Sequence, residues 1–99
     1  MTMEKDTTGK VLTVTPDSQL DTIVAREMEG ELRTVIEGVT ELIFDFSQVE
    51  YMTSAALRVL HSAHKVMKKQ GSMVVRHVNP EVMEIFEVTG FVDMLNIEA

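Results

Sequence analysis

Apolar and polar positions along the chain fall into blocks whose period changes between two and about 3.6 residues. Residues 11–14 are apolar and β-branched and lead into turn-forming residues 15–18, which predicts a strand and then a turn. Residues 22–37 carry apolar side chains at helical spacing, and Gly38 stands where a helix would end. The expected inner stripe of this helix is Ile23, Val24, Met28, Leu32, Val35 and Ile36.

The middle of the chain continues this alternation. Residues 42–46 are almost continuously apolar, which predicts a central strand covered on both faces, as in parallel sheets. Residues 54–69 predict a second helix that ends before Gly71. Its expected inner stripe is Leu57, Leu60, His64 and Met67.

A third strand–helix unit completes the pattern. Residues 73–78 predict a strand, and Asn79 followed by Pro80 predicts an N-cap and the first helical position. Gly90 would end this helix, and residues 94–97 suit a last, edge-like strand.

Alternating strands and helices imply crossover connections and parallel strand pairs. We therefore expect a single α/β domain over residues 1–99. It would have a mixed four- to five-stranded sheet and three main helices packed mainly on one face.

Composition narrows the function classes. Nine basic against sixteen acidic residues give a net charge of −7, which disfavours nucleic acid and anionic lipid as partners. The absence of cysteine excludes disulfides, thiolate catalysis and cysteine-based zinc sites. No apolar run approaches the roughly 20 residues that cross a bilayer, and no signal-peptide core is present, so we expect a cytoplasmic protein without direct membrane insertion.

The segment from residue 44 to residue 60 carries the most chemical information. It leads from a predicted buried strand into a helix that begins at Thr53 and Ser54, and Ser54 is a good N-cap candidate. A helix N-terminus offers unpaired N–H groups and a positive dipole end, so a phosphate on Ser54 would be stabilised there. The alternative is that Ser54 only caps the helix.

These residues resemble the STAS family, and in particular its anti-sigma factor antagonists. Asp45-Phe-Ser47 resembles the family's Asp-Leu-Ser strand end, and the five residues from Thr53 to Leu57 resemble its Asp-Ser-Ser-Gly-Leu helix start. Leu20-Asp21 resembles the Leu-Asp that opens the family's first helix. Thr89-Gly90, with its neighbours, resembles the Leu-Thr-Gly-Leu motif after the family's last helix. The likeness covers about four-fifths of the chain in the correct order.

The resemblance implies a bacterial partner-switching protein that transmits signals to transcription by binding. Such an antagonist binds an anti-sigma factor that is also a serine kinase, and is phosphorylated by it at the start of the middle helix. A serine phosphatase then reverses the modification. The resemblance thus implies a regulator that is not an enzyme and needs no cofactor.

The chain departs from the family pattern at the helix start. Thr53 replaces the aspartate, Ala55 the second serine and Ala56 the glycine. Either Ser54, with Thr53 as runner-up, accepts the phosphate in a shifted local register, or the protein switches by other means. We predict a partner-binding surface of Asp21, Asp45, Thr53, Ser54 and Arg58; Asp21 and Asp45 could equally only cap local N–H groups.

Two other hypotheses come from different classes. The chain could be a STAS subunit that docks on the ATPase of a lipid-transport complex, a role in which a serine or threonine also occurs at this step. Alternatively, it could be a small-molecule sensor or an enzyme, which would need a pocket with convergent polar groups that no constellation in the sequence suggests. His61 and His64 are spaced like metal ligands, but no carboxylate or cysteine supports them, so we expect no metal site. No glycine-rich phosphate loop precedes a helix, which leaves nucleotide hydrolysis unsupported.

Overall fold

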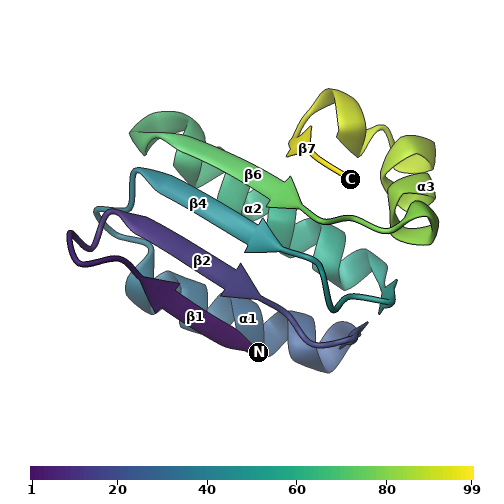
Figure 1. The fold of residues 1–99 in the computed structure, drawn as a ribbon, viewed down its shortest axis with the longest axis horizontal. Helices are drawn as coiled ribbons and strands as arrows, with labels where there is room; N and C mark the ends of the chain where they lie inside the picture. Colours follow the sequence, from purple (N-terminus) through teal and green to yellow (C-terminus); the bar gives the residue numbers. More distant parts are fainter.

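The computed structural model describes residues 1–99 as a layered α/β fold (Figure 1). Its main sheet has five strands in the order β1-β2-β4-β6-β7. These strands are β1 (Thr2–Lys5), β2 (Val11–Thr15), β4 (Glu41–Asp45), β6 (Ser72–Arg76) and β7 (Asn96–Ile97). β1 runs antiparallel to β2, and the remaining neighbours pair in parallel, which confirms the mixed sheet.

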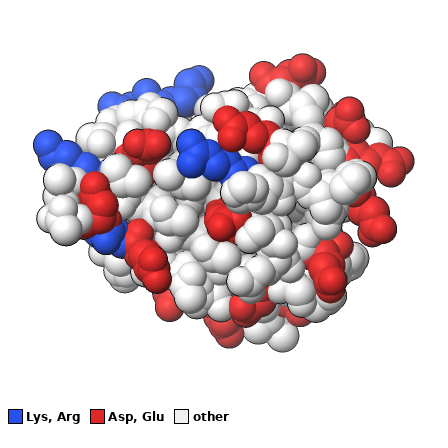
Figure 2. All heavy atoms as spheres, in the orientation of Figure 1, with Lys and Arg blue, Asp and Glu red and all other residues white.

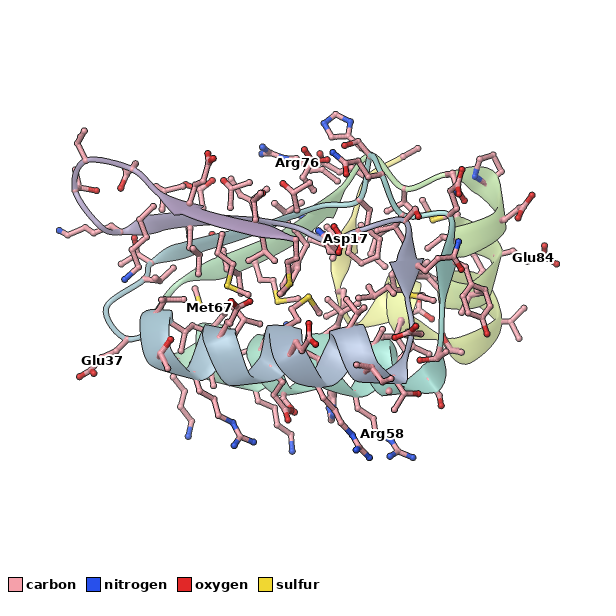
Figure 3. All side chains as sticks on the ribbon, turned by 90° about the horizontal axis from the view of Figure 1, so that it is seen from below. Asp17, Glu37, Arg58, Met67, Arg76 and Glu84 are labelled. Carbon is pink, nitrogen blue, oxygen red and sulfur yellow. The ribbon has the colours of Figure 1, made fainter.

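The three helices divide between one face and one end of the sheet. α1 (Thr22–Val35) and α2 (Ser54–Gln70) lie side by side under the same face, as Figure 3 shows edge-on. α3 (Pro80–Thr89) lies beyond the carboxyl end of β6 and is followed by the short 3-10 helix η1 (Phe91–Asp93). The predicted α/β class and helix number are confirmed, and α3 is the helix that leaves the common face.

The core lies between the sheet and the α1–α2 layer. Alternate strand residues such as Leu12, Val14 and Leu42 point into it and are fully buried, because successive side chains of a strand face opposite sides. α3 is anchored separately: the Phe86 ring lies 6.1 Å from that of Phe46, which in turn stacks edge-on against Phe44 at 6.5 Å. Aromatic contacts therefore join the end of β4 to α3.

Two expected burial patterns are wrong. Ile23, expected on the inner stripe of α1, is 69% exposed, whereas the predicted Met28 and Leu32 are buried together with Ala25 at three- and four-residue spacing. β4 is a central strand as predicted, but its residues alternate between buried and half-buried. No helix covers the second face of the sheet over β4, so this strand is not enclosed on both sides.

Several boundaries also differ from expectation. β6 ends at Arg76 because His77 takes a left-handed backbone, with φ of 60°, which a strand cannot continue. Met94 and Leu95 belong to the turn after η1, where their N–H groups donate to the Phe91 carbonyl, so the last strand shortens to Asn96–Ile97. β1 was not predicted, since its side chains are almost all exposed and carry no inward apolar pattern.

The C-terminal end of α2 packs tightly against the segment after α1. A Cβ atom on Gly71 would overlap the backbone carbonyl of Thr40, so only glycine fits there. The side-chain amide of Gln70 donates hydrogen bonds to the carbonyl oxygens of Ile36 at 2.9 Å and Val39 at 2.7 Å. The Gln70 amide thus adds a second donor to the Ile36 carbonyl, which also accepts from the N–H of Val39 at 3.1 Å, and supplies a donor to the Val39 carbonyl in the segment after α1.

Candidate functional site

A second, two-stranded sheet brings the N-termini of α1 and α2 together. β3 (Gln19–Leu20) pairs in parallel with β5 (Tyr51–Met52), with Leu20 opposite Met52. The N–H of Thr53 donates to the carbonyl of Leu20 at 3.1 Å. Since each strand is followed at once by a helix, both helices begin at the same end of the molecule.

The start of α1 is capped by a side chain. Asp21 has extended backbone angles, and its carboxylate accepts a hydrogen bond from the N–H of Val24 at 3.0 Å. This is the N-cap geometry in which a side-chain oxygen satisfies one of the helix's free donors. Asp21 therefore caps the helix, as the capping alternative predicted. The residue is half-buried, so part of its side chain stays exposed at the surface.

The start of α2 is built differently, and the expectation that Ser54 is the N-cap is wrong. Thr53 holds the N-cap position, with φ of −103° and ψ of 173°, and Ser54 is the first helical residue. Thr53 makes no capping hydrogen bond, and its Oγ1 is buried without a partner. The first N–H groups of α2 thus receive no side-chain oxygen from the N-cap, and the positive end of the helix dipole stays uncompensated there.

Ser54 and Arg58 lie on the outer face of α2. Both side chains are exposed and stand four residues apart, so they are neighbours on the helix surface. The inner face consists of Ala56, Val59, Leu60, Ala63 and Met67. Figure 3 shows Arg58 projecting away from the sheet. The hydroxyl predicted as phosphoacceptor is accessible, whereas that of the runner-up Thr53 is buried.

Asp45 is the predicted site residue that stands apart. It ends β4 in the main sheet, is half-buried, and accepts a hydrogen bond from the N–H of Ser47 at 3.0 Å. No hydrogen bond or ion pair joins it to Asp21, Thr53 or Ser54. The loop after Asp45 is held from the α3 side, because the Asn79 amide donates to the carbonyl of Val49 at 2.9 Å.

Sequence reasoning missed two apolar residues at this end of the molecule. Ile23, on the first turn of α1, is 69% exposed, and Tyr51 of β5 is 51% exposed. Both lie within three residues of the paired Leu20 and Met52. Exposed large apolar side chains are common in protein-binding surfaces. The competing stripe through Ala25, Met28 and Leu32 was the signal that Ile23 points outward.

The structure gives little support to a metal site or a membrane-spanning helix. No group of three or more His, Asp or Glu side chains is placed to hold a metal ion. None of the helices combines the length and the apolar character needed to cross a bilayer. The pKa of Asp6 is lowered by the hydrogen bond from the Thr8 hydroxyl, but this carboxylate lies in the β1–β2 turn, at the opposite end of the strands.

Comparison with protein families and known proteins identifies the fold. The family model described as the STAS domain matches residues 2–99. BtrV of Bordetella bronchiseptica, which bears the name of an anti-sigma factor antagonist, is 31% identical over 75 residues, or 74% of this chain. The anti-sigma-B factor antagonist of Bacillus subtilis is 28% identical over 82 residues, or 82% of this chain. The matched segments span 65% and 75% of those two proteins' own lengths.

Solved structures share the fold at low sequence identity. A Thermotoga maritima protein described as an anti-sigma factor antagonist superposes with a TM-score of 0.88 at 17% identity, covering 99% of this chain and 85% of that one. SpoIIAA, an anti-sigma factor antagonist, matches in its unphosphorylated form with a TM-score of 0.78 at 15% identity, covering 99% of this chain and 86% of that one. Its phosphorylated form, from Bacillus, gives 0.76 at 16% identity, covering 99% and 90%.

Proposed function

Because the chain belongs to the STAS domain family, we propose that it is an anti-sigma factor antagonist that binds an anti-sigma factor and thereby frees a sigma factor. It acts by binding and carries out no reaction of its own. Two curated relatives bear the name of anti-sigma factor antagonist, which favours this role over that of a transporter subunit. The observation that carries the proposal is the accessible Ser54 at the N-terminus of α2.

The docking surface in this proposal is the shared start of α1 and α2. Ile23 and Tyr51 supply exposed apolar anchors, while Ser54 and Arg58 supply polar groups beside them. An apolar centre with polar neighbours is the composition of a typical protein interface. Asp21 adds a carboxylate at the rim, and Asp45 stays a predicted contact from the end of the main sheet.

The partner in the finer proposal is a serine kinase, and the acceptor is Ser54. Its Oγ would form a bond to the γ-phosphorus of ATP as ADP departs, and the hydroxyl proton would be taken up by a base of the kinase. The phosphate would add about two negative charges at the positive end of α2, where they are compatible with the fold. The same charge would weaken docking of an acidic partner face. SpoIIAA has the same fold in both its unphosphorylated and its phosphorylated form, which supports a switch without refolding.

Phosphorylation of the purified protein tests this assignment. With ATP and the anti-sigma kinase that co-purifies with the protein from its own cells, intact-mass spectrometry should detect one added phosphate. Ser54→Ala should abolish the addition, whereas Ser62→Ala, which removes another exposed serine of α2, should not. An active kinase that adds no phosphate, or adds it equally to Ser54→Ala, contradicts the switch.

Binding can be tested separately from modification. Isothermal titration with the same kinase should give a Kd at least about tenfold weaker for Ser54→Asp than for wild type, or about 1.4 kcal/mol. Tyr51→Ala should also weaken binding, because it removes an exposed apolar anchor. Failure of the wild-type protein to bind any anti-sigma factor would contradict the antagonist role itself.

A further inference from the structure

The charges of α2 and α3 are opposite and unmixed. α2 contains Arg58, Lys65, Lys68 and Lys69 and no carboxylate, although the chain as a whole carries −7. α3 contains Glu81, Glu84 and Glu87 and no basic residue. In Figure 2 the α3 end carries acidic atoms without basic ones, while basic atoms line the edge where α2 ends. Two faces of the same molecule are therefore complementary in charge.

An apolar groove runs between α1 and α2 beside these cations. Its cavity of about 130 Å³ is lined by Leu32 of α1, by Ile36 directly after α1, and by Val59, Ala63 and Val66 of α2. Val66 is 39% exposed, so apolar surface reaches the mouth of the groove. Val66 also lines a neighbouring hollow on the α2 side, together with Lys65 and Lys69, so these cations lie next to the groove. The α1 side is electrically balanced, because Glu29 there pairs with Arg33 at 3.5 Å.

The outer face of α3 has chemistry that complements the groove and the cations next to it. Glu81, Glu84, Ile85 and Val88 follow helical spacing and line one shallow hollow on that face. Val88 is 80% exposed, which is the highest exposure among the large apolar side chains. An exposed valine with two carboxylates on the same helical stripe is an apolar anchor with an acidic flank.

We propose that α3 of one copy docks into the α1–α2 groove of a second copy. Val88 would lie against Val66, and Glu84 would pair with Lys65 or Lys69. The two surfaces differ and lie on different parts of the molecule, so each copy has one of each to offer. Such a head-to-tail contact forms open chains or rings rather than a twofold dimer. This inference does not depend on the proposed antagonist role.

The contact is expected to be weak. A ten-residue helix in a groove buries less than the roughly 1,200 Å² of a standard interface. We therefore expect a Kd on the order of 10⁻⁴ M for the self-association. Two copies of charge −7 also repel one another. At about 0.15 M salt the Debye length is about 8 Å, so the salt screens this long-range repulsion more strongly than it screens ion pairs in direct contact.

Exchanging the charges of one proposed ion pair tests the contact. Analytical ultracentrifugation of the wild type, up to about 1 mM, should show association with a Kd in the stated range. Glu84→Lys and Lys65→Glu should each weaken association at least tenfold. An equimolar mixture of the two variants should recover it, because each variant then meets the opposite charge on the other. Glu4→Lys and Lys5→Glu on β1 are controls that have the same net charges as Glu84→Lys and Lys65→Glu, respectively. Each control should associate like wild type, apart from the effect of the net charge that it shares with its test variant.

Methyl NMR of valine-labelled protein locates the contact in the same samples. On dilution the Val66 and Val88 signals should shift together, while Val11, on the open face of the sheet, should not. A wild type that stays a single monomeric species up to about 1 mM would overturn the proposal. So would association that both charge variants retain, or a mixture of folded variants that fails to associate.

Discussion

The two ends of α2 are built in opposite ways. At the C-terminal end, Gly71 contacts the backbone of Thr40, and Gln70 donates two hydrogen bonds to carbonyl groups after α1. At the N-terminal end, Thr53 makes no capping bond and Ser54 is exposed. The helix is thus fixed in position at one end and keeps unused donors and an accessible hydroxyl at the other. A modification or a partner can act on the open end while the closed end maintains the fold.

The largest effect is expected from Gly71→Ala at the closed end. The added methyl would overlap the Thr40 carbonyl, so the backbones must separate, at a cost of about 3 kcal/mol in the free energy of unfolding. Chemical denaturation measures this directly. Gly30→Ala is the matched control: it lies in α1 with open space around its Cβ position and should stabilise the protein by about 0.5–1 kcal/mol. Equal effects of the two substitutions would contradict the close packing at Gly71.

Gln70→Ala should have the next largest effect. It leaves the Val39 carbonyl without a donor in a partly buried place, at a cost of about 2 kcal/mol, while the Ile36 carbonyl keeps the hydrogen bond from the N–H of Val39 at 3.1 Å. Gln48→Ala, which shortens an exposed glutamine in a loop, should change the unfolding free energy by less than about 0.5 kcal/mol. If Gln70→Ala proves as mild as this control, Gln70 does not hold the closed end.

Thr53→Val gives the smallest change, and its sign is the informative part. The buried Oγ1 of Thr53 has no partner, so replacing the hydroxyl by a methyl group should stabilise the protein by about 0.5–1 kcal/mol. The same substitution at Thr34, whose hydroxyl donates to the Glu31 carbonyl at 2.7 Å, should not be stabilising. A destabilised Thr53→Val would mean that the hydroxyl is satisfied in solution and that the open end is capped after all. Thermal unfolding by calorimetry distinguishes these results.

The sequence predicted the elements whose pattern is local. The helix over residues 22–37 and the one over 54–69 were found because their apolar spacing and flanking glycines are readable within one segment. Asn79 and Pro80 begin α3 as expected, and the side-chain Oδ1 of Asn79 accepts from the N–H of Val82 at 2.8 Å. The alternation of strands and helices indicated the parallel strand pairs, and the family resemblance, carried by residues in the correct order, indicated the kind of protein.

What the sequence did not predict depends on tertiary contacts. β3 and β5 have two residues each, too few to show a period, and exist because Leu20 and Met52 meet in the folded chain. The shift of the N-cap from Ser54 to Thr53 is a one-residue difference that backbone geometry decides. The Gln70 hydrogen bonds join residues more than thirty positions apart, and no local pattern marks them.

The pairing of β3 with β5 also has a consequence for folding in the cell. Leu20 and Met52 are separated by 32 positions, so the paired helix starts exist only once these two distant segments have come together. A nascent or partly unfolded chain lacks that composite surface, even where its individual helices have formed. The anti-sigma factor that we propose as partner would therefore respond to the number of fully folded molecules rather than to the amount of polypeptide made.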